Sequence, residues 1–260
     1  MYPVQIPTFD CSGKTVVVTG AGSGIGQAAA MLFASYGANV VAADISEAAA
    51  EKTAEIIRRN GGRVHVVPVD ISQSQQVDRL ITQTVDHFGG VDVFVANAGI
   101  GGAVLPLLEQ TEEEFMNVVS VNLKGTFLCA KAAAAQMIHQ GRGGRIIITA
   151  SIGAFEGGGH HGPYGASKGA LVTLVRTMGR EWAEYGITVN AVCPGLTATA
   201  INQGLLEDKA LADSLLDKIP MHRMAQPEEI ASAMLYLATD AAAFITGTTL
   251  IADGGATTGG

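Results

Sequence analysis

A phenol and an ammonium group lie one helical turn apart in the sequence Tyr164-Gly165-Ala166-Ser167-Lys168. Positions i and i+4 of a helix share a face, so the two groups would lie close together. A phenol has a pKa of about 10 and is a poor base at neutral pH. An ammonium group within about 4 Å could supply the roughly 4 kcal/mol that brings this pKa near 7. The pair predicts proton transfer at a substrate oxygen, although this spacing alone is common on helix surfaces.

A glycine-rich loop follows the first apolar run of the chain. Its sequence is Gly20-Ala21-Gly22-Ser23-Gly24-Ile25-Gly26, and an apolar helical pattern comes directly after it. Such a loop lets backbone N–H groups and a helix N-terminus approach a pyrophosphate. The glycines follow G-x-x-x-G-x-G instead of the usual G-x-G-x-x-G. The loop predicts dinucleotide binding, and the alternative is a tight turn between strand and helix.

A carboxylate, Asp44, ends the second apolar run 18 residues after Gly26. In dinucleotide-binding folds an acidic residue at this distance accepts the hydroxyls of the adenosine ribose. It would repel a 2′-phosphate about 4 Å away by about 4 kcal/mol, at an effective dielectric near 20. No Lys or Arg lies between Gly20 and Glu51 to offset this repulsion. Asp44 therefore favours NAD over NADP, and the alternative is that it caps the next helix.

Short apolar runs alternate with helix-length segments along the chain. The runs cover residues 15–19, 39–43, 64–69, 91–96, 145–149, 188–192 and 248–251. Helical patterns cover residues 25–36, 47–60, 74–88, 112–140, 164–185 and 227–238, with Ser46 as an N-cap and Gly61 as a stop signal. Strands that are apolar on both faces and joined through helices form a parallel sheet covered on both sides. We expect an N-terminal extension at residues 1–10, then a single doubly wound α/β domain at residues 11–260, with seven parallel strands.

The composition excludes several classes of protein. The 260 residues are 48% hydrophobic and 15% charged, with a mean hydropathy of +0.29, which indicates a folded chain. A net charge of −8 would repel nucleic acid. Cys11, Cys129 and Cys193 are widely spaced and odd in number, which is typical of reduced thiols in the cytoplasm. Residues 1–10 lack the pattern of a secretion signal, and the uncharged residues 185–206 contain Asn, Pro and Gly, so we expect no membrane span.

Further polar residues follow the apolar runs, at the edge of the sheet where ligands bind in open α/β folds. Ser151 follows residues 145–149, Asn97-Ala98-Gly99 follows another run, and Asn122 lies within a helical pattern. Together with the glycine loop, the Tyr164 and Lys168 pair, Pro194-Gly195, residues 245–247 and residues 253–255, they make the chain resemble the short-chain dehydrogenase/reductase family. These motifs occur in family order over almost the whole chain after Asp10, so the resemblance is specific to the family but not to a substrate.

The resemblance implies a Rossmann fold and hydride transfer between a nicotinamide cofactor and a secondary alcohol or ketone. Tyr164 would be the acid/base, Lys168 would lower its pKa and bind the nicotinamide ribose, and Ser151 would hold the substrate oxygen. Asn122 would position a water that links Lys168 to solvent. The remaining implied cofactor contacts are Asp70 and Ile71 at the adenine, Asn97, Ala98 and Gly99 beneath the cofactor, and Pro194, Gly195, Thr197 and Thr199 beside the nicotinamide. The chain departs from the family pattern at Ala96 and at residues 224–226, neither of which touches this chemistry.

The segments expected to line a substrate pocket are residues 100–108, 152–161 and 196–220. They are mostly apolar with few cations, which predicts a small uncharged alcohol or ketone. His160 and His161 precede Tyr164 without further ligands at a suitable spacing, so we expect no metal site. Either one of them lines the pocket, or both lie in a solvated loop.

Two other functions compete with an NAD-dependent alcohol dehydrogenase. A 3-oxoacyl-carrier-protein reductase using NADPH is one, and Asp44 argues against it. A regulator that holds NAD without turnover is the other, and the presence of Ser151, Tyr164 and Lys168 together argues against that. The helical patterns at 112–140 and 164–185 carry apolar residues on more than one face, at Val118, Val121, Phe127, Ala132, Leu171, Val172, Leu174 and Val175. Such faces predict assembly through these helices, as a homotetramer.

Overall fold

The strands of the sheet bear out the expected doubly wound arrangement. The computed structural model describes residues 8–157, 159–199, 202 and 209–258. Its strands are β1 (Thr15–Thr19), β2 (Asn39–Asp44), β3 (Arg63–Pro68), β4 (Val93–Ala96), β5 (Gly144–Thr149), β6 (Ile187–Pro194) and β7 (Thr249–Ala252). All pairings are parallel, in the order β3-β2-β1-β4-β5-β6-β7. From β1 the strands are added toward β3 on one side and from β4 toward β7 on the other, so the strand order reverses between β1 and β4. Ligands bind at this switch point in folds of this kind.

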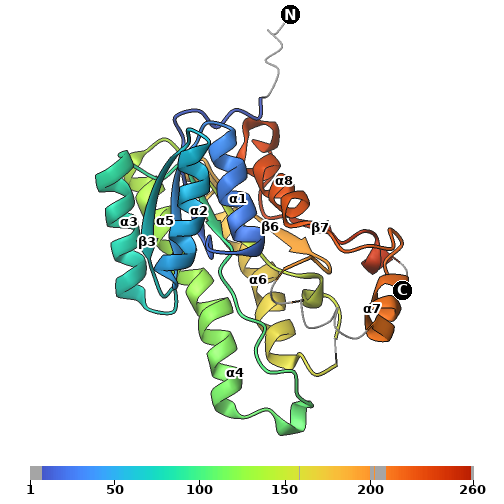
Figure 1. Cartoon of the computed structure of the whole chain (residues 1–260). Helices are drawn as coiled ribbons and strands as arrows, with labels where there is room; N and C mark the ends of the chain where they lie inside the picture. Colours follow the sequence, from blue (N-terminus) through green and yellow to red (C-terminus); the bar gives the residue numbers. More distant parts are fainter. Residues whose placement is uncertain (1–7, 158, 200–201, 203–208, 259–260) are drawn as a thin grey trace, which may run out of the picture.

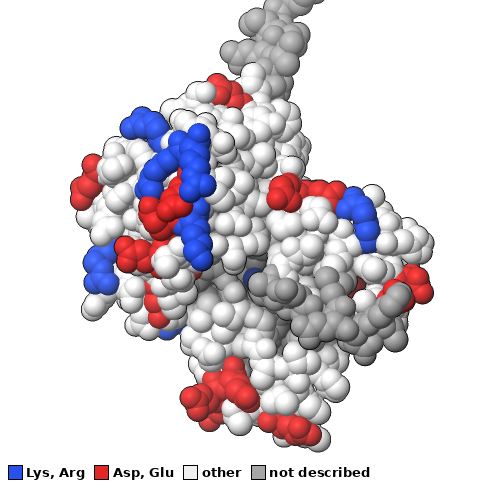
Figure 2. All heavy atoms as spheres, viewed as in Figure 1, with Lys and Arg blue, Asp and Glu red and all other residues white. Residues whose placement is uncertain are grey.

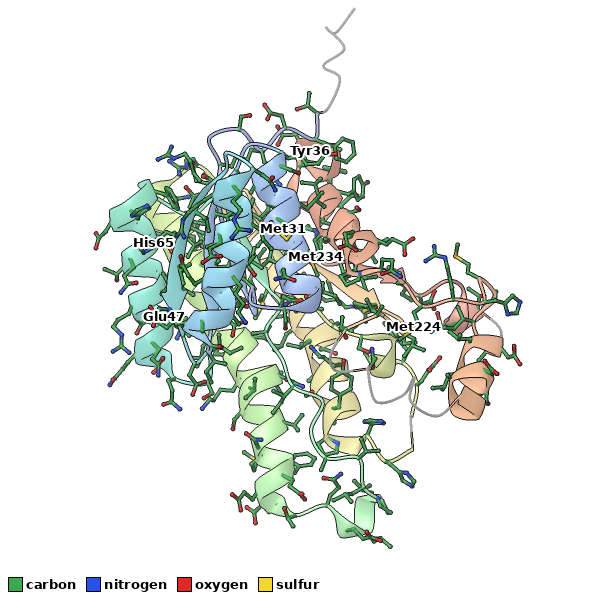
Figure 3. All side chains as sticks on the ribbon, viewed as in Figure 1. Met31, Tyr36, Glu47, His65, Met224 and Met234 are labelled. Atoms are coloured by element: carbon green, nitrogen blue, oxygen red, sulfur yellow. The ribbon has the colours of Figure 1, made fainter. Side chains whose placement is uncertain are left out.

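The two faces of the sheet are covered by different helices (Figure 1). The helices are α1 (Gly24–Ser35), α2 (Glu47–Arg59), α3 (Ser74–Phe88), α4 (Glu112–Val119), α5 (Thr126–Gln140), α6 (Gly162–Glu181), α7 (Lys209–Asp217) and α8 (Pro227–Ala238). Helices α1, α2 and α8 contribute to one core layer, and α3, α5 and α6 contribute to the other. Met31 of α1 and Met234 of α8 belong to the first layer (Figure 3). Along β1, Val16 and Val18 face one layer and Val17 the other, as strand geometry requires.

The two edge strands depart from the expectation that every strand is buried on both faces. The described strands β1, β2, β4, β5 and β6 are almost wholly buried. In β3, Arg63 and Pro68 are exposed, and in β7 the side chain of Ile251 is 42% exposed. An edge strand has a neighbour on one side only, so apolar sequence alone overestimates its burial.

The helical pattern at residues 112–140 is not one regular helix. A π-helical segment at Ser120–Gly125 separates α4 from α5. Its hydrogen-bonded turns hold one residue more than an α-turn, and such segments occur frequently at functional sites. A 3.6-residue pattern does not reveal this interruption. Asn122 lies inside it, so the segment bears directly on the candidate site.

The sequence signals for the two ends of α2 agree with the structure. The Ser46 hydroxyl accepts from the Ala49 N–H at 3.3 Å, which confirms the predicted cap of α2. Gly61 follows the end of α2 with a φ of 78°, in the left-handed region where glycine is favoured. Helix α7 was not predicted from the sequence. The N-terminal boundary at residue 11 stays a prediction, because residues 1–7 lie outside the described part of the chain.

Candidate active site

The glycine loop joins β1 to α1 at the carboxyl edge of the sheet. A Cβ on Gly26 would lie 2.0 Å from the Gly20 carbonyl oxygen, so the loop admits only glycine there. Ser23 is the N-cap of α1, but its side chain makes no capping hydrogen bond, and the first turn of this helix carries no acidic residue. The first N–H groups of α1 are therefore available to an anion, which suits a pyrophosphate.

Asp44 lies beside this loop, at the end of β2. Its Oδ2 accepts from the Gly22 N–H at 2.9 Å, and its Oδ1 accepts from the Ser46 N–H at 2.9 Å. The cap of α2 is Ser46, so the alternative in which Asp44 caps that helix is wrong. The structure thus brings the carboxylate to the glycine loop, as the predicted ribose contact requires.

Asn97 connects three strands beneath the loop. Its Nδ2 donates to the Thr19 carbonyl at 3.1 Å, and its Oδ1 accepts from the Thr149 hydroxyl at 3.1 Å. The Thr19 hydroxyl in turn accepts from the N–H groups of Asn97 and Ala98, at 3.0 and 3.2 Å. The carboxyl ends of β1, β4 and β5 therefore form one hydrogen-bonded floor. Sequence reasoning named Asn97 and Ala98 but missed Thr19.

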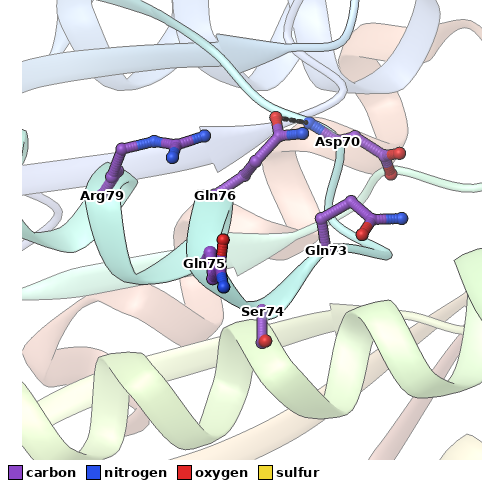
Figure 4. A pocket seen from close by; sticks show the side chains of 6 residues that line it. All are labelled: Asp70, Gln73, Ser74, Gln75, Gln76 and Arg79. Carbon is purple, nitrogen blue, oxygen red and sulfur yellow. Dashed lines mark hydrogen bonds between the residues drawn. The ribbon is translucent and has the colours of Figure 1, made fainter.

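The candidate adenine contacts follow β3. Asp70 Oδ1 accepts from the Ser72 N–H at 2.9 Å, and the Asp70 N–H donates to Gln76 Oε1 at 2.9 Å. Asp70 lines a surface hollow of about 480 Å³ together with five residues of the first turns of α3 (Figure 4), which are Gln73, Ser74, Gln75, Gln76 and Arg79. Ile71 is buried, and a Cβ on Gly125 would lie 2.9 Å from it. Of the two predicted adenine contacts, Ile71 thus lies against the π-helical segment and Asp70 lies at the start of α3.

The segment after β6 reaches back to the glycine loop. Gly195 packs so closely on Asp253 that a Cβ there would lie 2.8 Å from its Cα. The hydroxyl of Thr197 donates to the Gly195 carbonyl at 3.0 Å and is buried. The methyl carbon of Thr199 lies 3.1 Å from the point where a Cβ on Gly24 would be. Predicted phosphate and nicotinamide contacts that are far apart in sequence are therefore neighbours in space.

Tyr164 and Lys168 occupy the first turns of α6. Lys168 is buried, and its Nζ donates to the Thr149 carbonyl at 2.7 Å and lies 5.7 Å from the centre of the Tyr164 ring. Burial lowers the pKa of Lys168 to about 8. Burial also raises the pKa of Tyr164, and a hydrogen bond with Ser151 opposes this rise. The expected lowering of the phenol pKa by Lys168 is not found in this structure, because desolvation dominates.

Ser151 begins a short helical turn, Ile152–Ala154, directly after β5. Its hydroxyl accepts from the Gly153 N–H at 3.1 Å. A Cβ on Gly153 would lie 3.4 Å from this hydroxyl and 3.6 Å from the Tyr164 ring. The hydroxyl and the phenol thus border the same point at the carboxyl edge of the sheet. Cys193 is buried nearby, and burial raises the pKa of its thiol to about 11.

Asn122 is fully buried in the π-helical segment. Its Oδ1 accepts from the Ile100 N–H at 2.8 Å, and its Nδ2 donates to the Ile100 carbonyl at 2.9 Å. A Cβ on Gly99 would lie 3.1 Å from Asn122 Oδ1 and 3.5 Å from Lys168 Nζ. The structure therefore brings together three of the predicted site residues, namely Gly99, Asn122 and Lys168. Nδ2 also donates to the Ser167 hydroxyl at 3.2 Å, a contact that the sequence analysis did not anticipate.

The two histidines before α6 are both exposed. The His160 carbonyl accepts from the Leu105 N–H at 3.1 Å, which joins two of the expected pocket walls. His160 has a φ of 67°, a conformation that residues other than glycine seldom adopt. Much of the third wall, at residues 200–201 and 203–208, lies outside the described residues. Within those described, no group of three or more His, Cys, Asp or Glu is arranged to hold a metal ion.

Charged side chains form separate groups on the face that Figure 2 shows. They lie over α2 and α3, at the tip of α4 and, on the right of the view, over α8 and beside α7, with mostly uncharged surface between. On α2 they include the ion pairs of Arg58 with Glu51 and of Arg59 with Glu55. No helix in the described part of the chain is long and apolar enough to span a bilayer.

Residues 20–257 match the family model described as enoyl-(acyl carrier protein) reductase. The chain belongs to the short-chain dehydrogenase/reductase family. It is 41% identical to a 2,5-dichloro-2,5-cyclohexadiene-1,4-diol dehydrogenase of Sphingobium indicum, over 95% of this chain and 98% of that protein. It is also 41% identical to a 3-oxoacyl-[acyl-carrier-protein] reductase of Synechocystis, over 94% and 97%. The crystal structure of a gluconate 5-dehydrogenase from Burkholderia cenocepacia, in complex with NADP and tartrate, matches with a TM-score of 0.92 and 34% identity, over 97% and 98%. This short-chain dehydrogenase/reductase is therefore an oxidoreductase.

Proposed function

We propose that the protein is an NAD-dependent dehydrogenase that interconverts an uncharged secondary alcohol and the matching ketone. The observation that carries the proposal is the meeting of Ser151, Tyr164, Lys168 and Asn122 at the edge of the sheet where Asp44 borders the glycine loop. NAD supplies the hydride acceptor when it is bound. The chain itself supplies the proton transfer and the hold on the substrate oxygen.

The proposed roles follow from the contacts of each side chain. Tyr164 takes the proton of the alcohol at its phenol oxygen, or returns it to the ketone. Ser151 donates to the substrate oxygen and orients it toward Tyr164. Lys168 holds the nicotinamide ribose, and Asn122 places a water that relays the proton to solvent.

The cofactor would lie along the edge formed by the other predicted residues. Gly20, Ser23, Gly24, Ile25 and Gly26 would hold the pyrophosphate. The free N–H groups of α1 and the fit of glycine at Gly26 support this placement. Asp44 supports NAD, although the Burkholderia relative is described with NADP.

The described residues of the expected pocket walls favour an uncharged substrate. Residues 100–108 and 152–161 contain no Lys or Arg. Large apolar side chains there are exposed, among them Val104, Leu107 and Phe155. Arg223, beside the third wall, is paired with Glu229 at 2.7 Å. The name of the Sphingobium relative, a cyclic diol dehydrogenase, supports this class of substrate.

A substrate panel tests the proposal. It contains cyclic alcohols, polyols, hydroxysteroids and acyl thioesters, each assayed with NAD(H) and NADP(H) by absorbance of the reduced nicotinamide. We expect turnover of an uncharged cyclic or secondary alcohol with NAD. Turnover confined to 3-oxoacyl thioesters with NADPH would instead establish the second candidate, which the Synechocystis relative favours.

We also propose a homotetramer in the cytoplasm. Four of the apolar residues expected to form its contacts, Val118, Leu171, Val172 and Val175, are buried within the chain itself and offer nothing to a partner. The exposed apolar side chains of α4 and α5 include Phe115, Met116 and Phe127, at 38, 48 and 37%. These support the proposal, and a monomer by light scattering at micromolar concentration would overturn it.

The three cysteines are free and buried, which suits the reducing conditions of the cytoplasm.

A further inference from the structure

Ser167, the residue directly before Lys168 in the Tyr-x-x-x-Lys motif, makes its own connections to the site. Ser167 is 1% exposed, and its hydroxyl donates to the Tyr164 carbonyl at 2.7 Å. The same oxygen accepts from Asn122 Nδ2 at 3.2 Å. One hydroxyl therefore joins the first turn of α6 to the π-helical segment.

These two bonds require the same orientation of the Asn122 amide as its two bonds to the Ile100 backbone. A serine hydroxyl has one proton, and here that proton is given to the Tyr164 carbonyl. Toward Asn122 the hydroxyl oxygen can only accept, so the amide must present its N–H₂ group to Ser167. The amide oxygen must then face the Ile100 N–H, on the side where Gly99 borders Lys168.

The burial of Asn122 makes this orientation costly to lose. Both N–H groups and the oxygen of the amide have partners, namely Ser167 and the Ile100 backbone. Without the Ser167 oxygen, one N–H would be buried and unpaired, which is strongly unfavourable. An amide turned by 180° would set its oxygen against the Ile100 carbonyl, which is repulsive.

We propose that Ser167 is a positioning residue for the reaction: it satisfies the second N–H of the Asn122 amide and ties this amide to the turn that carries Tyr164. This inference rests on the proposed function. In the proposed function, Ser167 touches neither the substrate nor the cofactor. Its effect reaches the chemistry through Asn122 and the Tyr164 backbone.

The test compares Ser167→Ala with a matched control, Thr84→Val. Thr84 is likewise a buried hydroxyl that donates to a carbonyl of its own helix, Leu80 at 2.7 Å, but it lies in α3. We expect Ser167→Ala to lower kcat about fivefold to tenfold while KM for NAD stays within about threefold. Thr84→Val should lower the melting temperature and leave kcat unchanged. A Ser167→Ala variant that loses stability but keeps full kcat would overturn the proposal.

Two further measurements test the inference if Ser167→Ala does not fold or if no substrate is found. Ser167→Thr retains the hydroxyl and should keep more kcat than Ser167→Ala, and it replaces that variant if the alanine protein does not fold. Nuclear magnetic resonance of the Asn122 side-chain amide needs no substrate. We expect slow exchange of these protons in the wild type and in Thr84→Val, and faster exchange in Ser167→Ala, which leaves one N–H without an acceptor. Equal exchange in all three would contradict the proposal, whereas a wild type inactive on the whole panel would contradict the proposed function alone.

Discussion

Asp44 Oδ2 lies 2.9 Å from the Gly22 backbone nitrogen, so the carboxylate at the end of β2 holds the glycine loop in place. A Cβ on Gly22 would lie 2.9 Å from the same oxygen and 2.6 Å from the Ala49 methyl, so a larger residue would push the loop away from Asp44. The group proposed to select the cofactor thus also shapes the loop that would bind its phosphates.

Cofactor preference should depend on the charge of Asp44. We expect the wild type to favour NAD over NADP at least about a hundredfold in kcat/KM, which corresponds to about 3 kcal/mol of differential binding. Asp44→Ala should narrow this gap because the repulsion of a 2′-phosphate is gone. Asp44→Asn also removes the charge but keeps one oxygen to accept from Gly22 or Ser46, so it separates charge from loop shape. Equal wild-type efficiency with both cofactors would contradict the argument.

Turnover should depend on the Tyr164 hydroxyl. Tyr164→Phe removes only that group and leaves the ring beside Gly153 and the ammonium of Lys168. Turnover should fall by about 10² to 10⁴, the usual contribution of a positioned acid/base. NAD affinity, measured by calorimetry, should stay within a few-fold. Near wild-type turnover in Tyr164→Phe would require another proton acceptor.

The titration of Tyr164 should depend on the cofactor. Burial raises the phenol pKa in this structure, so cofactor-free protein should ionise Tyr164 above the ordinary value of about 10. The oxidised nicotinamide is positively charged, and such a charge lowers the pKa of a nearby phenol. Alcohol oxidation should therefore rise with pH through an ionisation below 10. Ultraviolet difference spectra of the wild type against Tyr164→Phe, with and without NAD, measure both values, and identical values would refute this account.

The buried Lys168 should make stability depend on pH. Its pKa is about 8 in the folded protein and about 10.5 in an unfolded chain. Between these values the unfolded chain binds more protons, so this group adds stability as pH rises and imposes its full penalty below pH 8. Lys168→Met should thus gain up to about 3 kcal/mol over the wild type at neutral pH, and the gain should shrink toward pH 10.5. Urea unfolding of both proteins at neutral and alkaline pH provides the measurement, and a gain independent of pH would exclude a buried charge.

Much of this arrangement could be predicted from local sequence. The strand β1 and the glycine loop carry patterns that span only a few residues, as does the cap of α2 at Ser46. Parallel strands also bring their carboxyl ends to one edge, which is why Asp44, Asn97 and Ser151 could be placed together without coordinates.

Other features depend on contacts that no local pattern contains. The π-helical segment leaves the apolar spacing of residues 112–140 almost unchanged, so it was read as one helix. The sequence assigns no role to Ser167, because its partners Asn122 and Tyr164 meet it only in the folded chain. The burial that raises the pKa of Tyr164 is likewise set by the folded chain and cannot be read from the spacing of Tyr164 and Lys168.

The π-helical segment also constrains how the length of the chain can vary. A π-helical turn holds one residue more than an α-helical turn, so deleting one residue within Ser120–Gly125 would convert the segment to regular α-helix without rotating α5. The buried side of α5, which carries Cys129, Ala133 and Met137, would still face the core. Loss of one residue between α4 and α5 should therefore disturb the wide turn that holds Asn122 more than it disturbs the fold.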